Sequence, residues 1–158
     1  PEVAYQQNAT DGTIKFALTL DGGQEVETVW IPDGERATLC VSSQVGCALD
    51  CSFCSTGKQG FQRDLTVAEI IAQVWIAHRS FGTPEHKGAR HITNIVMMGM
   101  GEPLHNYDET MKALRILGTD CGLAVGPRRI TLSTVGVLPA LERLTKSLFI
   151  MITTGYYC

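Results

Sequence analysis

Three cysteines crowd into eight residues, at Cys47, Cys51 and Cys54, in the pattern C-x3-C-x2-C. Thiolates on one short loop can bind three irons of an iron–sulfur cluster, whereas a [4Fe–4S] cluster ordinarily takes four protein thiolates. Gly46 and Gly57 flank the loop and give its backbone the freedom to wrap around such a cluster. The spacing therefore favours a [4Fe–4S] cluster with one iron that has no protein ligand.

An iron without a protein ligand can bind a small molecule. It can hold the amino and carboxyl groups of S-adenosyl-L-methionine (SAM) and deliver an electron to the sulfonium of that molecule. The resulting adenosyl radical does chemistry that side chains cannot do unaided. On this interpretation the cofactors are the [4Fe–4S] cluster and SAM.

Other interpretations of the same cysteines stay open. A structural zinc site needs a fourth ligand, and the histidine nearest in sequence is His78. Cys51 and Cys54 could form a thiol redox pair, although the third cysteine and the Ser-Phe between them fit that role less well. The three cysteines could also stay reduced without a metal.

The composition bounds the class of protein. The chain has 158 residues, of which 44% are hydrophobic and 18% charged, as in one soluble globular domain. No apolar run approaches the ~20 residues that span a bilayer, and residues 1–12 lack the pattern of a signal peptide. We therefore expect no membrane as a partner. The net charge of −3 gives no general electrostatic reason to bind nucleic acid.

The cysteine usage also bears on the compartment. Cys40, Cys121 and Cys158 are scattered, and the other three lie too close together to make a useful disulfide framework. The pattern therefore predicts a reducing compartment, the cytoplasm.

The segments before the cysteine loop have the pattern of β-strands. Residues 13–20 and 24–31 are strand-like runs, and Asp21-Gly22-Gly23 between them is a hairpin signal. Residues 37–43 form a third β-like stretch that leads directly into the cysteine loop. We therefore expect an antiparallel β-hairpin followed by a strand that positions the cysteines.

After the cysteine loop the pattern changes to alternating helices and strands. Thr66 and Glu69 form a capping box. A stripe at helical spacing follows and is predicted to be buried; its members are Val67, Ile70, Ile71, Val74 and Trp75. A break at residues 82–84 ends this helix. The further predicted elements are a strand over 94–100, a helix from Asn106 to Gly118, a strand over 128–135, a helix over 139–146 and a strand over 147–154.

Alternation of this length implies parallel strands joined by crossover helices. The expected fold class is α/β: a partial β/α barrel of about four parallel strands, preceded by the hairpin. The expected division is an N-terminal extension over 1–36 and the N-terminal half of the barrel over 37–158, with the C-terminal half absent. Candidate groups converge on the rim where parallel strands end, because the cysteines and Gly101-Glu102 follow strands and Ser133-Thr134 lie near the end of another. Met97, Met98 and Met100 are interpreted as core packing.

Three separate segments of the chain resemble segments of a known protein family, and they occur in the same order. They lie at residues 36–61, 93–104 and 128–137, and the resemblance covers roughly residues 25 to 148. The cysteine pattern after a first strand resembles the radical SAM superfamily, and the longer strings resemble its RlmN family. Members of that family are dual-specificity RNA methyltransferases, which methylate C2 of adenine in 23S rRNA and in tRNA. The resemblance implies a radical SAM barrel, those two RNA partners, and an electron donor such as flavodoxin.

The resemblance also assigns cofactor ligands. It places the cluster ligands at Cys47, Cys51 and Cys54, and it implies that Gly101, Glu102 and Ser133 contact SAM. A glycine lets the backbone approach a ligand, and a carboxylate can accept from an ammonium group. On the residues alone, Gly-Glu-Pro is more often a simple turn and Ser133 a satisfied strand hydroxyl.

Two catalytic roles are implied in the same way. Glu27 falls on the family's glutamate that removes the adenine C2 proton, although by itself it reads as a solvated hairpin residue. Cys40 falls on the resolving thiol, which forms the disulfide that releases the product. As a residue alone, Cys40 could equally be a small buried strand side chain.

The sequence also departs from the family. An N-terminal helical domain, later β/α units and the methyl-carrying cysteine have no counterpart here, and the resemblance fails after about Leu148. Cys158 is not the methyl-carrying cysteine. We therefore expect this chain to be inactive alone. The alternatives are the related Cfr family, which methylates C8 of adenine in rRNA, and a non-catalytic zinc module that binds RNA.

Overall fold

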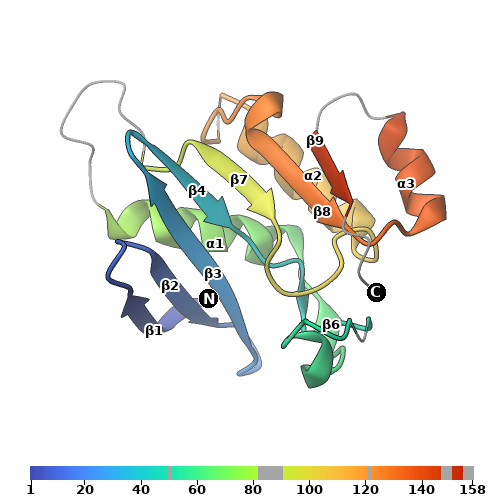
Figure 1. The fold of residues 1–158 in the computed structure, drawn as a ribbon, viewed down its shortest axis with the longest axis horizontal. Helices are drawn as coiled ribbons and strands as arrows, with labels where there is room; N and C mark the ends of the chain where they lie inside the picture. Colours follow the sequence, from blue (N-terminus) through green and yellow to red (C-terminus); the bar gives the residue numbers. More distant parts are fainter. Residues whose placement is uncertain (50, 82–90, 121, 147–150, 155–158) are drawn as a thin grey trace.

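The computed structural model describes residues 1–49, 51–81, 91–120, 122–146 and 151–154. Its main feature is a seven-stranded sheet in the order β1-β2-β3-β4-β7-β8-β9 (Figure 1). The strands are β1 (Glu2–Asn8), β2 (Ile14–Thr19), β3 (Glu25–Asp33), β4 (Arg36–Cys40), β7 (Asn94–Met97), β8 (Ile130–Thr134) and β9 (Met151–Thr154).

The predicted hairpin at the front of the chain is confirmed. Strands β2 and β3 pair antiparallel, and Leu20 N–H donates to the Gln24 carbonyl at 2.8 Å across the turn. The structure adds β1, which pairs antiparallel with β2 and which the sequence analysis did not predict. All seven residues of β1 are exposed, and its apolar residues are confined to Val3, Ala4 and Tyr5, which is too short a run to mark a strand.

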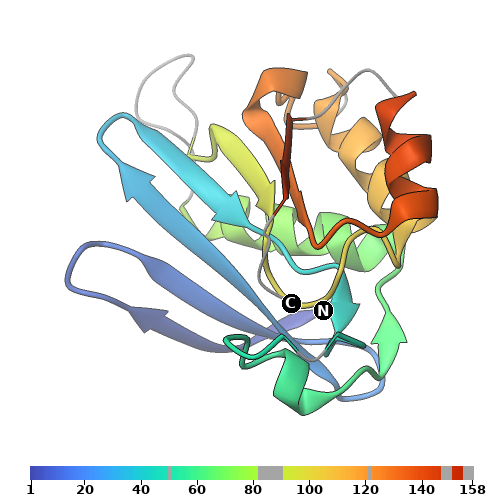
Figure 2. The ribbon, with the colours of Figure 1, turned by 45° about the vertical axis from the view of Figure 1, so that its right-hand side comes forward.

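The predicted alternation of parallel strands and helices is also confirmed. Strands β4, β7, β8 and β9 pair in parallel, and the helices between them are α1 (Val67–Ser80), α2 (Tyr107–Gly118) and α3 (Leu138–Thr145). Figures 1 and 2 show these helices on one side of the parallel strands, as in the wall of a β/α barrel. The fold is the expected partial barrel with antiparallel strands in front.

The helix starts are set by local hydrogen bonds. Thr66 and Glu69 make the predicted capping box, in which Thr66 Oγ1 accepts from Glu69 N–H at 3.3 Å and Glu69 Oε2 accepts from Thr66 N–H at 2.9 Å. Asn106 occupies the N-cap position of α2 without making a side-chain cap. Its amide instead donates to the carbonyls of Ser43 and Leu65, at 2.8 and 2.7 Å.

The core lies between the parallel strands and the helices. Leu39, Ile95 and Leu132, at the centres of three neighbouring strands, are fully buried, and Ile70 and Val74 of α1 pack in the same cluster. Burial of such side chains contributes roughly 1.5–3 kcal/mol each. In the part of the chain that the structure describes, no helix is both long enough and apolar enough to cross a membrane.

Two predicted core residues are on the surface. Met97 and Met100 are buried as expected, but the side chain of Met98 is 58% exposed because β7 ends at Met97 and the chain turns. Trp75 is 55% exposed, and the Arg79 guanidinium lies 4.6 Å above its ring. Trp75 follows Val74 by one residue, which rotates it about 100° away from the buried face of α1.

Parts of the prediction fall outside the described residues. These are the helix break at 82–84, residues 147–150 of the last predicted strand, and Cys121 and Cys158. The described end of that strand, β9, pairs in parallel with β8. Two short strands not predicted from the sequence, β5 (Gln44–Val45) and β6 (Arg63–Asp64), pair antiparallel in a small second sheet.

Candidate functional site

The loops after β4 and β7 lie against each other at one end of the sheet. The N–H groups of Ser43 and Gln44 both donate to the Met100 carbonyl, at 2.8 and 3.1 Å. Met100 N–H in turn donates to Ser42 Oγ at 2.9 Å. A Cβ on Gly99 would lie 2.8 Å from the Ser42 nitrogen, so this close contact requires glycine. The cysteine loop therefore starts from the rim where the parallel strands end, as predicted.

The cysteine loop has a closed base. Strands β5 and β6 pair on either side of it, and Cys47 N–H donates to the Gly60 carbonyl at 3.2 Å. Gly46 has φ of +72°, and a Cβ there would overlap the Gly60 carbonyl oxygen. The prediction that Gly46 supplies conformational freedom is confirmed at this position.

The three cysteines of the loop are close in sequence and largely shielded. Cys47 and Cys51 are buried at 9% and 8% exposure, and Cys54 is partly buried. Cys54 N–H donates to the Cys51 carbonyl at 2.9 Å. Among the described residues, no three His, Cys, Asp or Glu side chains are arranged to hold a metal ion. Cys47 and Cys54 are free thiols in the described residues. Three soft sulfur donors on one loop, once reduced, would fit an iron–sulfur cluster chemically, and this ligation stays a prediction.

Gly101 and Glu102 follow β7 and pack on the start of the cysteine loop. Gly101 has φ of +92°, and a Cβ there would lie 2.7 Å from Gln44 Cγ. Glu102 N–H donates to Gln44 Oε1 at 2.8 Å. The glycine is therefore required by a close approach of two loops, besides any contact with a ligand.

The Glu102 carboxylate is 4% exposed and already has partners within the chain. Its Oε1 accepts from Leu104 N–H at 2.9 Å and from Thr134 Oγ1 at 2.6 Å, and its Oε2 accepts from Val135 N–H at 3.0 Å. A carboxylate offers about four acceptor positions, so one remains on Oε2. The predicted contact of Glu102 with SAM therefore stays possible chemically and stays a prediction.

The predicted contact residue on β8 is Ser133, which is partly buried and pairs with Thr153 of β9. The residue that meets Glu102 is its neighbour Thr134. Successive strand residues face opposite sides of a sheet, so the two hydroxyls serve different surroundings. The sequence places Thr134 near the strand end but carries no signal of its bond to Glu102.

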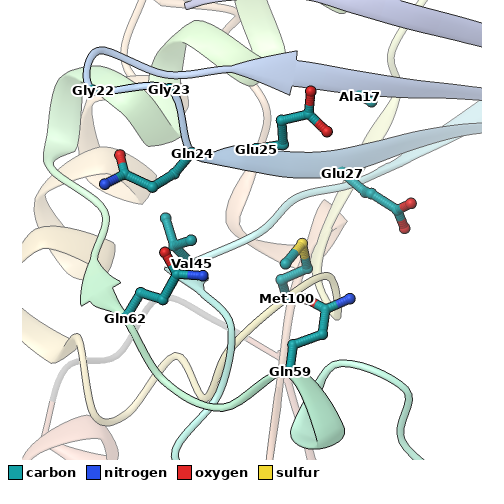
Figure 3. A pocket seen from close by; sticks show the side chains of 10 residues that line it. All are labelled: Ala17, Gly22, Gly23, Gln24, Glu25, Glu27, Val45, Gln59, Gln62 and Met100. Atoms are coloured by element: carbon teal, nitrogen blue, oxygen red, sulfur yellow. The ribbon is translucent and has the colours of Figure 1, made fainter.

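Glu27 lies on β3 beside a cleft of about 490 Å³. Figure 3 shows Glu25 and Glu27 along the strand on one side of the cleft, with Gln59, Gln62 and Met100 on the other side. The Glu27 side chain is 51% exposed, and its Oε1 lies 3.0 Å from Lys15 Nζ. Its backbone is tied to the rim, because Ser42 Oγ donates to the Glu27 carbonyl at 2.6 Å. The structure thus brings Glu27 close to the cysteine loop and to the β7 loop.

Cys40 is the last residue of β4 and pairs with Val29 of β3 and Val96 of β7. Desolvation raises the pKa of its thiol, and a hydrogen bond from the Met98 backbone opposes this only in part. The thiol is therefore protonated at neutral pH. Cys40 is not among the described residues that line the Glu27 cleft, so the structure does not bring the two predicted catalytic residues together there.

Comparison with known proteins gives close relatives. Two curated proteins named dual-specificity RNA methyltransferase RlmN match this chain. The one from Alcanivorax borkumensis is 55% identical over 157 residues, which is 99% of this chain and 41% of the relative. The one from Marinobacter nauticus is 58% identical over 144 residues, which is 91% of this chain and 39% of the relative. The chain therefore spans about two-fifths of the length of these relatives.

A solved structure and a family model agree with these relatives. A radical SAM methyltransferase from Sphaerobacter thermophilus has a crystal structure that matches with a TM-score of 0.87 and 44% identity, over 96% of this chain and 44% of that one. The model of the radical SAM superfamily matches residues 41–155, which include the cysteine loop, the helices α1, α2 and α3, and strands β7 to β9. This chain therefore belongs to the radical SAM superfamily.

Proposed function

We propose that this chain is the cluster-binding part of a radical SAM RNA methyltransferase, which methylates C2 of adenine in 23S rRNA and tRNA. The observation that carries the proposal is the convergence at one rim of the cysteine loop, the Gly101-Glu102 segment and the Glu27 cleft. The names of the relatives that match most of this chain support the choice of reaction.

The cofactors of the proposed enzyme are a [4Fe–4S] cluster and SAM. Cys47, Cys51 and Cys54 would hold the cluster, and Gly101, Glu102 and Ser133 would contact SAM. Together the two cofactors supply radical chemistry, which side chains lack. The chain's own contribution is to close the cysteine loop at its base and to hold the Gly101-Glu102 segment against it.

Glu27 is proposed as the base that takes the proton from adenine C2. Its carboxylate projects beside a cleft large enough for a nucleobase, between the hairpin and the cysteine loop. The Lys15 ammonium, 3.0 Å from Oε1, orients the carboxylate from outside the cleft. The Gln59 and Gln62 side chains on the other wall offer amide donors and acceptors to the edge of a base.

Cys40 is proposed as the resolving thiol. In this role it forms a disulfide with the cysteine that carries the methyl group in the family, and so releases the product. Its raised pKa keeps the thiol protonated and unreactive until it is deprotonated for that step. Because the chain spans 41% of a matching relative, we expect that the region matched here cannot complete methyl transfer alone.

The location and partners follow from the same proposal. We place the enzyme in the cytoplasm, where its RNA substrates and an electron donor such as flavodoxin are found. The clustered cysteines support this placement, because a reducing compartment keeps them available as ligands.

Anaerobic reconstitution with iron and sulfide tests the cofactor assignment. The protein is expected to acquire iron, sulfide and a brown chromophore, and Cys51→Ala should abolish the chromophore. Cys40→Ala is the matched control, since Cys40 lies outside the cysteine loop, and it should keep the full signal. Binding of zinc alone, or a full cluster signal in Cys51→Ala, would contradict the proposal.

The position of the methyl group tests the reaction. The complete enzyme that carries this region is incubated with an rRNA fragment, and the methylated adenine is analysed by mass spectrometry against both standards. We expect 2-methyladenosine. Methylation at C8 would assign the chain to the related Cfr type of reaction instead.

A further inference from the structure

A chain of buried polar side chains connects the cysteine loop to the loops after β7 and β8. Its members are Gln44, Glu102 and Thr134, which are 1%, 4% and 3% exposed. Buried polar groups destabilise a protein unless they are hydrogen-bonded, and all three are bonded to one another or to the nearby backbone. The connection therefore forms one satisfied network at the proposed cofactor site.

Gln44 links three segments through its two amide atoms. Its Nε2 donates to Asp64 Oδ1 at 2.7 Å, and its Oε1 accepts from Glu102 N–H at 2.8 Å. Gln44 stands just before the cysteine loop and Asp64 just after it, so one amide joins both ends of that loop to the β7 loop. A glutamate at this position could not donate to Asp64, and a methionine could make neither bond.

Thr134 fixes the other side of the network. Its hydroxyl donates to Glu102 Oε1 at 2.6 Å and accepts from Gly136 N–H at 3.0 Å. Val135 N–H holds the second carboxylate oxygen at 3.0 Å. The Glu102 carboxylate is therefore held by two donors from the end of β8 as well as by Leu104 N–H from its own loop.

The charge of Glu102 indicates what this network is built for. Its described hydrogen-bond partners are two backbone amides and one hydroxyl, all of them neutral. A buried carboxylate is costly when no cation compensates it. One acceptor position on Oε2 is left. A cationic ligand would therefore bind here with a carboxylate that is already oriented.

We propose that Gln44 and Thr134 are positioning residues for SAM, which hold Gly101 and Glu102 ready to accept a hydrogen bond from the amino group of the ligand. The inference rests on the proposed function, because it takes SAM as the ligand. Neither residue needs to touch the ligand; each acts through Glu102. Loss of one hydrogen bond to a buried charged group weakens binding by about tenfold or more.

Equilibrium binding to the anaerobically reconstituted protein tests the proposal. Thr134→Val should bind SAM about tenfold more weakly, Gln44→Met should do the same, and Thr134→Ser should restore binding to within about twofold. The matched control is Thr93→Val, at the opposite ends of β4 and β7. Thr93 is 9% exposed, and its hydroxyl bonds with the Ala37 backbone at 3.0 and 2.9 Å.

A second ligand separates positioning from loss of structure. 5′-Methylthioadenosine has the adenosine part of SAM without its amino and carboxyl groups, so Thr134→Val should bind it as the unaltered protein does. Equal weakening for both ligands would show a merely structural role. Should Thr134→Val fail to fold, Gln44→Met gives the same comparison.

The two proposals fail in distinguishable ways. An unaltered protein that takes up neither a cluster nor SAM would overturn the proposed function. An unaltered protein that binds SAM, with Thr134→Val and Gln44→Met binding it as tightly as Thr93→Val does, would overturn the positioning role alone.

Discussion

Gly46 and Gly60 meet at the base of the cysteine loop, so closely that a Cβ on Gly46 would overlap the Gly60 carbonyl oxygen. The same carbonyl accepts from Cys47 N–H at 3.2 Å. Beyond this contact the chain leaves the small sheet of β5 and β6 and enters the segment with the three cysteines. The contact thus fixes the backbone position of Cys47, the first cysteine of the loop.

Gly46→Ala tests this contact. The change places an L side chain on a backbone in the left-handed region, which costs about 1 kcal/mol. The overlap of the new Cβ with the Gly60 carbonyl oxygen costs about 1–3 kcal/mol more. We expect a lower free energy of unfolding in urea and less iron bound per chain after reconstitution.

Gly34→Ala is the control for this variant. Gly34 has φ of +59° in the β3–β4 turn, and a Cβ there would meet no atom within 4 Å. It should lose only about 1 kcal/mol and should bind iron normally. Equal losses in the two variants would show that the overlap at Gly60 relaxes without consequence.

The ion pair of Arg63 and Glu69 gives a pH prediction. The two guanidinium nitrogens of Arg63 lie 2.8 and 2.9 Å from the two carboxylate oxygens of Glu69, whose side chain is 13% exposed. Hydrogen bonds from Arg63, and then from Thr66, lower the pKa of Glu69 to about 2. Since the folded-state pKa lies below the unfolded one, the ionised pair stabilises the fold above pH ~4.5, and this stabilisation is lost as the pH falls toward 2.

Glu69→Gln should therefore destabilise the protein by about 1–2 kcal/mol at pH 7, measured by urea unfolding. The difference from the unaltered protein should shrink as the pH falls below 4.5. Glu35→Gln, in the exposed β3–β4 turn, is the control and should change little. A destabilisation by Glu69→Gln that is constant from pH 7 to pH 3 would contradict the ion-pair explanation.

The Cys40 thiol gives a prediction of reactivity. Because desolvation raises its pKa, the thiolate fraction at any pH is lower than in an ordinary cysteine. We expect slow alkylation by iodoacetamide at pH 8, followed by mass spectrometry of the Cys40 peptide, and a rise with pH centred above 9. The same peptide in guanidinium chloride is the reference. If Cys40 reacts as fast in the folded protein as in the unfolded reference, its pKa is not raised by desolvation, and the prediction is wrong.

Elements with local signals could be predicted from the sequence. The capping box of Thr66 and Glu69 and the turn between β2 and β3 depend on neighbours within four residues, and both are as predicted. The parallel strands follow from their alternation with helices. By contrast, the apolar residues of β1 are confined to Val3, Ala4 and Tyr5, and β5 and β6 are two residues long. None of these three strands is long or apolar enough to leave a periodic signal.

The network at the rim could not be predicted in the same way. Gln44 meets Glu102 across 58 residues, and Thr134 meets it across 32. A glutamine or a threonine belongs to no motif there, and its partner is set only when the strands are side by side. The resemblance indicated Glu102 as a ligand residue, but the bonds that hold its carboxylate required the tertiary structure.

Glu27→Gln separates chemistry from stability. The ion pair with Lys15 is half exposed, and such pairs contribute about 0–1 kcal/mol, so unfolding should hardly change. Methylation of an rRNA fragment by the complete enzyme should fall by about a hundredfold or more, because an amide cannot accept the proton.

The matched control is Glu25→Gln. Glu25 lies two residues earlier on the same face of β3 and lines the same cleft. Its substitution by glutamine therefore removes an equal charge from the same surroundings. It should retain activity to within a few fold of the unaltered enzyme. Equal losses in both variants would mean that the cleft needs negative charge rather than a base at Glu27. If only Glu27→Gln loses methylation activity, the proton transfer is assigned to the Glu27 carboxylate. The comparison is matched because both glutamates are exposed, lie on β3 and line the same cleft.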